Sequence, residues 1–159
     1  MRIRKEISPW NGKMFIRITL IVFVIYNGLM LLAKTLDGDA LFSLSYTWIF
    51  NCVIQPLVFA STFTNASRKM TLFINDFQNI DSFEDKLNTS ILNKGMSTNQ
   101  RGDNIAHYVA TGWFYKLFNN WDGTETVRVK WGNEVVIEGS SRIVSQVEDS
   151  LTWNKAFKS

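Results

Sequence analysis

The sequence predicts a membrane protein of the α+β class, in which an N-terminal two-helix transmembrane hairpin is followed by a small cytoplasmic domain. That domain is expected to contain a helix, two or three antiparallel strands and a second helix. Two observations lead to this prediction. Residues 18–33 and 40–67 contain no charged side chain, so all 17 lysines and arginines and all 14 acids lie elsewhere. Residues 124–131 alternate between two faces, as strands do.

Two segments are long enough to cross a bilayer as helices. Residues 14–33 would cover about 30 Å at 1.5 Å per residue, which is the thickness of the hydrocarbon core. Residues 41–63 are long enough to cross with some tilt. Residues 34–40 leave room only for a short turn, so the two helices must run antiparallel. A signal peptide is the competing interpretation of the first segment, but its apolar region is too long and no small-residue cleavage pattern follows it.

The basic residues around these segments set the expected orientation. Residues 1–13 form a basic N-terminal segment, and Arg68 and Lys69 follow the second span. The turn between the spans has Lys34 alone, next to two aspartates. Lysine and arginine are enriched in cytoplasmic loops. We therefore expect a multi-pass inner-membrane protein with both termini in the cytoplasm and the turn in the periplasm.

Polar residues inside the spans are expected to hold the two helices together. Asn27 and Thr47 lie at the same depth when the spans are aligned antiparallel, and so do Thr19 and Gln55. Each pair is expected to form a hydrogen bond between the helices. Asn51 has no partner at its own depth. A transport pathway is the alternative interpretation, but two helices cannot enclose a pore and neither span contains an acidic residue.

The unpaired Asn51 predicts association with another molecule, because an amide in lipid gains by finding a partner. Ser45 and Cys52 lie on or close to the same face of the second span. The expected partner on this side is a second copy of the chain or another membrane protein. Cys52 is the lone cysteine and is interpreted as a small apolar residue. With one cysteine and one histidine, a structural zinc site is excluded.

The remaining residues are expected to form a juxtamembrane helix over 64–80 and a cytoplasmic α+β domain over 81–159. The helix is predicted because Met70, Phe73 and Ile74 fit one helical face. A tight turn at Gly132-Asn133 is typical of a β-hairpin. The expected elements of the domain are a helix from Ser82 to Lys94, a polar loop over 96–104, strands over 105–110, 124–131 and 134–138, and a final helix over 141–157.

No catalytic or cofactor motif occurs in the chain. Phosphate-binding glycine loops, metal-ligand spacings and nucleophile signatures are all absent from the sequence. We therefore expect no enzymatic activity and no cofactor. His107 is interpreted as a half-buried strand residue and not as a general base.

Two groups of side chains are candidates for binding. The aromatic residues Trp113, Tyr115 and Trp121 form a candidate partner surface. The basic residues Arg128, Lys130 and Arg142 are candidate anion contacts, since the last of them opens a helix and helix N-termini favour anions. A nucleic-acid surface is the alternative interpretation of the first two, but a solvated strand face explains them more simply, so no specific nucleic acid is expected.

The layout of two spans and a small module without catalytic residues resembles that of small bacterial inner-membrane proteins, namely plasmid or phage exclusion proteins and toxin-immunity proteins. This resemblance implies a non-enzymatic protein that binds another membrane-associated protein. The layout is also similar to that of membrane effectors of antiviral defence, which implies a ligand-gated effector that senses a small anion. An accessory subunit of a membrane complex is a further alternative.

Overall fold

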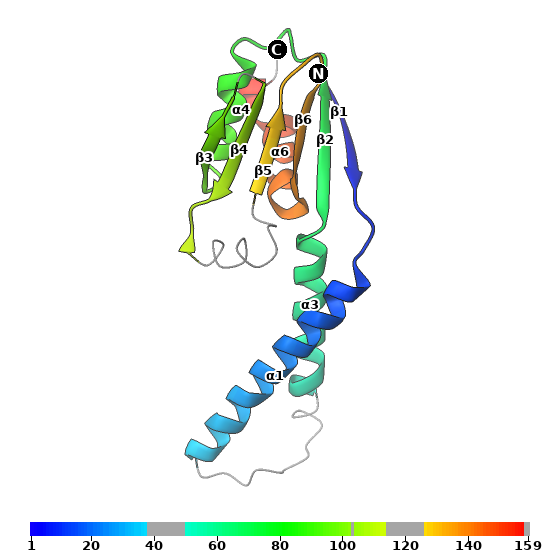
Figure 1. Ribbon diagram of the computed structural model, residues 1–159, viewed down its shortest axis with the longest axis vertical. Helices are drawn as coiled ribbons and strands as arrows, with labels where there is room; N and C mark the ends of the chain where they lie inside the picture. The colour runs from blue at the N-terminus through cyan, green and yellow to red at the C-terminus, as the bar shows by residue number, and fades with distance from the viewer. Residues whose placement is uncertain (38–49, 103, 114–125, 158–159) are drawn as a thin grey trace. The chain divides into compact units, whose positions relative to one another are not determined.

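The chain divides into two compact units, each of which we describe by itself. A computed structural model describes residues 1–37, 50–102, 104–113 and 126–157 (Figure 1). Residues Trp10–Ala66 form the helical unit, and Met1–Pro9 together with Ser67–Ser159 form the sheet domain.

The helical unit contains α1 (Gly12–Asp37) and a second helical stretch, which begins with the π-helical turn η1 (Phe50–Ile54) and continues as α3 (Gln55–Ala66). Asn11 caps α1, since its side-chain oxygen accepts a hydrogen bond from the Met14 N–H at 3.0 Å. The helices α1 and α3 run side by side in opposite directions (Figure 1).

Within the described residues, α1 is the helix that is long and apolar enough to cross a membrane. Over Gly12–Leu36 the mean hydropathy reaches 2.1, and only 6 % of that window is buried inside the protein. The second expected span, residues 41–63, lies partly outside the described residues. Its described part is helical from Phe50 onward, and the helix continues to Ala66.

The sheet domain is an α+β domain, as the sequence predicts. Its described strands form a six-stranded antiparallel sheet in the order β1-β2-β6-β5-β4-β3. The helices α4 (Phe83–Leu92) and α6 (Ser141–Trp153) pack against one face of this sheet, and a short 3₁₀ turn, η2 (Lys155–Phe157), follows α6. The strands are β1 (Arg2–Ile7), β2 (Lys69–Asn75), β3 (Met96–Arg101), β4 (Ile105–Ala110), β5 (Thr126–Lys130) and β6 (Val135–Ser140).

The core of the sheet domain lies between this face and the two helices. Every second residue of the central strands points into it, for example Leu72 on β2 and Ile137 on β6, which are Cα partners and fully buried. From the helices, Leu87 and Val147 reach the same core. Both helices therefore cover one face of the sheet, which we call the covered face.

Three expectations about this domain are wrong. The juxtamembrane helix expected over residues 64–80 does not form, because Lys69–Asn75 is the strand β2. Its apolar residues fit a helical spacing, but they also fit a period of two, and pairing with β1 and β6 on both sides decides between them.

The basic N-terminal segment 1–13 is not a separate tail, because Arg2–Ile7 is the edge strand β1 of the sheet. The polar residues expected to form a loop over 96–104 include the other edge strand, β3. The described residues therefore form six strands, where two or three were expected. Edge strands are exposed on one side and need few buried residues, so their sequences carry little alternation.

Candidate functional site

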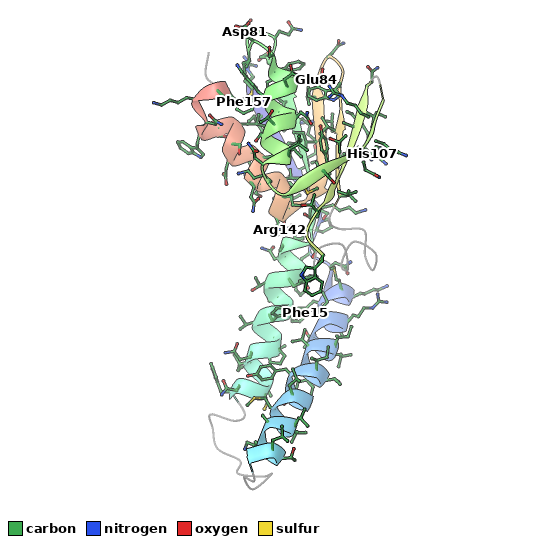
Figure 2. All side chains as sticks on the ribbon, turned by 90° about the vertical axis from the view of Figure 1, so that its left-hand side faces the viewer. Phe15, Asp81, Glu84, His107, Arg142 and Phe157 are labelled. Carbon is green, nitrogen blue, oxygen red and sulfur yellow. The ribbon has the colours of Figure 1, made fainter. Side chains whose placement is uncertain are left out.

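The sheet has one face that no described element covers, and this uncovered face is the candidate functional site. All of its residues are exposed or half-buried. Figure 2 shows His107 on the opposite side of the sheet from Phe157, which belongs to the core. The register of the strands places on the uncovered face Arg4, Glu6, Thr71, Phe73, His107, Val109, Arg128, Lys130, Val136 and Glu138.

Arg128 occupies the centre of the uncovered face. Its Cα partners in the ladder are His107 on β4 and Glu138 on β6. The Glu138 carboxylate is paired with Lys130, whose Nζ lies 3.0 Å from Oε1. Arg128 is exposed and forms no ion pair with any residue in the described ranges. Its guanidinium therefore remains open to a carboxylate or phosphate, which arginine binds with two parallel hydrogen bonds.

Apolar side chains lie beside this charge. Val136 is the Cα partner of Lys130 on one side and of Phe73 on the other. At the β1 edge, the Arg4 guanidinium carbon lies 4.4 Å from the centre of the Phe73 ring, a cation–π contact. The uncovered face thus combines apolar side chains with charged ones.

The uncovered face shows no arrangement for covalent or metal chemistry. The part of the chain that the structure describes contains no group of three or more His, Cys, Asp or Glu residues able to hold a metal ion. The lone cysteine, Cys52, is buried in the helical unit.

Tyr108 lies on the covered face, and its environment is that of a structural residue. Its hydroxyl donates a hydrogen bond to Asn88 Oδ1 at 3.0 Å, which ties β4 to α4. Burial raises the pKa of the Tyr108 hydroxyl; the nearby Arg101 opposes this change, and Glu84 adds to it.

The three predicted anion contacts do not come together. Arg128 and Lys130 lie on one face of β5, as the alternation predicts. Arg142 lies in the first turn of α6, which packs against the covered face. Of the predicted aromatic surface, Trp113 is 78 % exposed, and Tyr115 and Trp121 lie outside the described residues.

The polar residues of the hairpin are only partly placed as expected. Asn27 Nδ2 donates across to the Cys52 carbonyl at 3.2 Å and to the Phe23 carbonyl of its own helix at 2.7 Å. The cross-helix bond has a clear cause, since Pro56 has no N–H to offer the carbonyl four residues before it. Thr47, the expected partner of Asn27, lies outside the described residues.

The expected hydrogen bond between Thr19 and Gln55 is not present. Thr19 Oγ1 is buried without a hydrogen-bond partner in the described ranges, and Gln55 is exposed. The bond from Asn27 to Cys52 explains the difference. It fixes an alignment in which Thr19 lies level with about residue 60 and not with Gln55. Cys52 is also buried against α1, so it does not share an outward face with Asn51.

Sequence reasoning missed several residues of the uncovered face, including Arg4, Phe73 and Glu138. The first two belong to strands that were not expected. Ile3 and Ile7, which fall on one face of a strand, were a weak signal for β1. Comparison with protein families, curated proteins and solved structures finds no match to the chain.

Proposed function

We propose that this chain is a non-enzymatic, membrane-anchored binding protein. Its helical unit crosses the bacterial inner membrane twice, and its sheet domain lies in the cytoplasm and binds another membrane-associated protein through the uncovered face. The proposal of a membrane anchor rests on the position of the helical unit in the chain, between β1 and β2 of the sheet domain. The proposal of a binding surface rests on the exposed Arg128 at the centre of the uncovered face.

The helical unit is inserted between two neighbouring strands. Ile7, the last residue of β1, is the Cα partner of Met70 on β2. Beyond this pair, the Ser8 N–H donates to the Lys69 carbonyl at 2.8 Å, and Arg68 Nε donates to the Ser8 carbonyl at 2.8 Å. The chain therefore leaves the sheet domain after β1 and returns to it at the same place, at the start of β2.

A chain that leaves and returns at one point crosses a membrane an even number of times. Since α1 is long enough to cross, the chain needs a second crossing to bring β2 back beside β1. The stretch from η1 to α3 is 17 residues long (50 to 66), or about 26 Å at 1.5 Å per residue. It supports the two-span hairpin predicted over residues 14–33 and 41–63.

The sheet also constrains the orientation. Because β1 pairs with β2 in a single sheet, residues on both sides of the hairpin lie on the same side of the membrane. The flanks carry the basic residues Arg2, Arg4, Lys5, Lys13, Arg68 and Lys69, whereas the turn has Lys34 alone. This asymmetry favours a cytoplasmic sheet domain.

The chemistry of the uncovered face supports a protein partner. The exposed Arg128 guanidinium forms no ion pair with any described residue, and Val109 and Val136 lie on the neighbouring strands. This combination fits a protein surface that presents a carboxylate beside apolar residues. The most specific version of this proposal is an exclusion or immunity protein, whose partner is a protein of a plasmid, a phage or a toxin. The alternative, a ligand-gated effector, would use a small anion; the separation of Arg142 from Arg128 and Lys130 makes it the second choice.

Site-specific photo-crosslinking in membranes tests the proposal. A crosslinking amino acid at Val109, on the uncovered face, is expected to give a discrete adduct with a membrane-associated protein. The same amino acid at Asp149, exposed on α6, is the control and gives none. Arg128→Glu is expected to reduce the adduct about tenfold or more, because it replaces an attraction by a repulsion. Equal adducts from both positions, or an adduct that Arg128→Glu leaves unchanged, would contradict the proposal.

A thermal-shift measurement distinguishes the ligand-gated effector from the protein-binding proposal. Purified full-length protein is heated with inorganic phosphate or with nucleotides, and the melting temperature of the sheet domain is recorded. A rise that Arg128→Glu removes supports the ligand-gated effector, since a ligand that binds the folded state stabilises it. An unchanged melting temperature supports the protein partner.

A further inference from the structure

The second helical stretch carries the side-chain amides of Asn51 and Gln55, which differ in environment from the amide of α1. Asn51 is half-buried and Gln55 is exposed. Neither side chain forms a hydrogen bond with any other described residue, whereas Asn27, the amide of α1, donates to two carbonyls. In the two-span hairpin, on which this inference rests, both amides would face lipid.

Gln55 lies at the middle of the membrane-crossing part. The hydrogen bond from Asn27 to the Cys52 carbonyl sets Gln55 level with about residue 24, which is the midpoint of α1. From the other direction, Gln55 is 11 residues, or about 16 Å, from Ala66, the end of α3. Half of the hydrocarbon thickness is about 15 Å. At this depth neither water nor headgroups reach the amide, so only a protein group can satisfy it.

The two amides belong to a continuous outward face. Asn51, Gln55, Val58 and Thr62 follow one another at spacings of four, three and four residues. Val58 is 57 % exposed and Thr62 is exposed. The inward residues of the same stretch, Cys52, Pro56, Ala60 and Thr64, are all buried. Alternating spacings of three and four residues form the seam along which two helices pack at a shallow crossing angle.

We propose that the face formed by Asn51, Gln55, Val58 and Thr62 joins two copies of this chain within the membrane. The face bears no charge and therefore does not select a charged partner. An amide carries both donors and an acceptor, so it is its own complement. In a two-fold arrangement Gln55 meets Gln55 of the second copy, and each amide satisfies the other at the depth where it has no alternative.

Disulfide crosslinking in native membranes tests the pairing. In a Cys52→Ser background, a cysteine replaces Val58 on the proposed face. The matched control replaces Leu57, the next residue, which is 37 % exposed and points to another side of the helix. Oxidation is expected to give a dimer of the chain from position 58, about tenfold more than from position 57. Equal yields at the two positions, or none, overturn the proposal.

A second measurement tests the amides themselves. Gln55→Leu keeps the size of the side chain but removes its donors and acceptor, and self-association in detergent micelles is expected to weaken about 3- to 30-fold. Val58→Leu, the control, keeps an apolar residue in the seam and leaves association within about twofold. Association that is unchanged or strengthened by Gln55→Leu would show apolar packing and overturn the amide pairing.

Extraction of the membranes with alkaline carbonate distinguishes failure of the pairing from failure of the membrane-spanning hairpin. Retention of the chain in the membrane, together with absence of the dimer, overturns the pairing alone. Release of the chain into the supernatant overturns the membrane-spanning hairpin and the pairing with it. A crosslink from position 58 to a different protein, without a dimer, shows that the face serves another membrane protein and overturns the second copy as its occupant.

Discussion

The helical unit and the sheet domain differ in where they place apolar residues. The sheet domain buries them, and α1 exposes many of them. In the sheet domain, Leu72 and Leu87 are fully buried between the sheet and its helices. In α1, Leu20 and Leu29 are about as exposed as side chains on a protein surface, at 60 % and 61 %. In the sheet domain other side chains shield the apolar residues from water, whereas the described residues leave Leu20 and Leu29 of α1 open.

The comparison shows that the exposure of apolar side chains in a folded unit indicates which medium surrounds that unit. A long helix that is apolar on all sides is stable in a water-soluble protein only when other elements surround it. Within the described residues α3 packs along α1, and many apolar side chains of α1 are exposed. The contrast with the closed core of the sheet domain is what supports the bilayer as its surroundings.

The largest expected effect contrasts two leucines. Leu72→Ala should lower the stability of the sheet domain by about 2–5 kcal/mol, because it leaves a cavity in a closed core. That corresponds to a fall of roughly 10 °C or more in melting temperature. Leu29→Ala, on the open side of α1, should leave this transition unchanged. Near-ultraviolet circular dichroism of the full chain in micelles measures both, and similar shifts would remove the distinction between the two units.

A second contrast uses two glycines. A Cβ at Gly139 would lie 3.0 Å from the Thr126 carbonyl oxygen and 3.0 Å from Val144 Cγ2 of α6. The Thr126 backbone and the Val144 side chain must therefore give way by a few tenths of an ångström, and Gly139→Ala should cost about 1–3 kcal/mol. A Cβ at Gly28 meets no described residue within 4 Å, so Gly28→Ala should leave stability unchanged or raise it, since alanine favours helices. Thermal unfolding of both variants checks the opposite signs.

The next effect depends on pH and concerns the closed core alone. The unfolded chain releases the Tyr108 proton near pH 10, whereas burial raises the pKa in the folded state. Between these two values the folded state holds more protons, so stability should fall as the pH rises above about 10. Tyr108→Phe should lose about 1 kcal/mol at neutral pH, because the hydrogen bond to Asn88 is gone.

The same variant isolates the titration of this hydroxyl. Urea unfolding of the wild type and of Tyr108→Phe is compared between about pH 9 and pH 11. The difference in stability between the two proteins should shrink as the pH rises, because only the wild type pays the cost of the buried hydroxyl. A constant difference would mean that Tyr108 does not titrate differently in the two states.

The smallest expected effect lies on the uncovered face. Lys130 and Glu138 form an ion pair whose side chains are 43 % and 38 % exposed. A double-mutant cycle with Lys130→Ala and Glu138→Ala should give a coupling of about 0.2–1 kcal/mol, reduced further by salt. A coupling above this range would mean that this face is shielded from water by residues of the chain, and it would then be a second closed surface and not a binding site.

Sequence reasoning recovered the elements whose residues meet partners close by in the chain. The hairpin of β5 and β6 was expected, and α4 and α6 carry a buried stripe at helical spacing, so each shows its own pattern. The expected two-residue turn at Gly132-Asn133 is wrong, because Lys130 pairs with Val136 and residues 131–134 connect the two strands. The elements that it missed depend on distant pairing. The residues of β2 satisfy two periods at once, and its partners β1 and β6 lie more than 60 residues away in either direction.

The candidate site was predictable to a similar degree. Alternation placed Arg128 and Lys130 on the polar side of a strand, but the sequence did not show that Lys130 is paired with Glu138 and that Arg128 is not. That distinction depends on the register between β5 and β6. Arg142 was grouped with them because it is basic and opens a helix, whose N-terminus favours anions, and only the packing of α6 separates it.

The pairing of Ile7 with Met70 also determines the order in which the protein can be completed. Residues 8 to 69, 62 in all, leave the ribosome between the two partners. Until Met70 has been made, β1 has no partner strand, and β2 keeps an open edge until β1 pairs with it. If the helical unit spans the membrane twice, as we propose, a chain with one span misplaced keeps β1 and β2 on opposite sides. The first strand, Arg2–Ile7, would then pair only in properly inserted molecules.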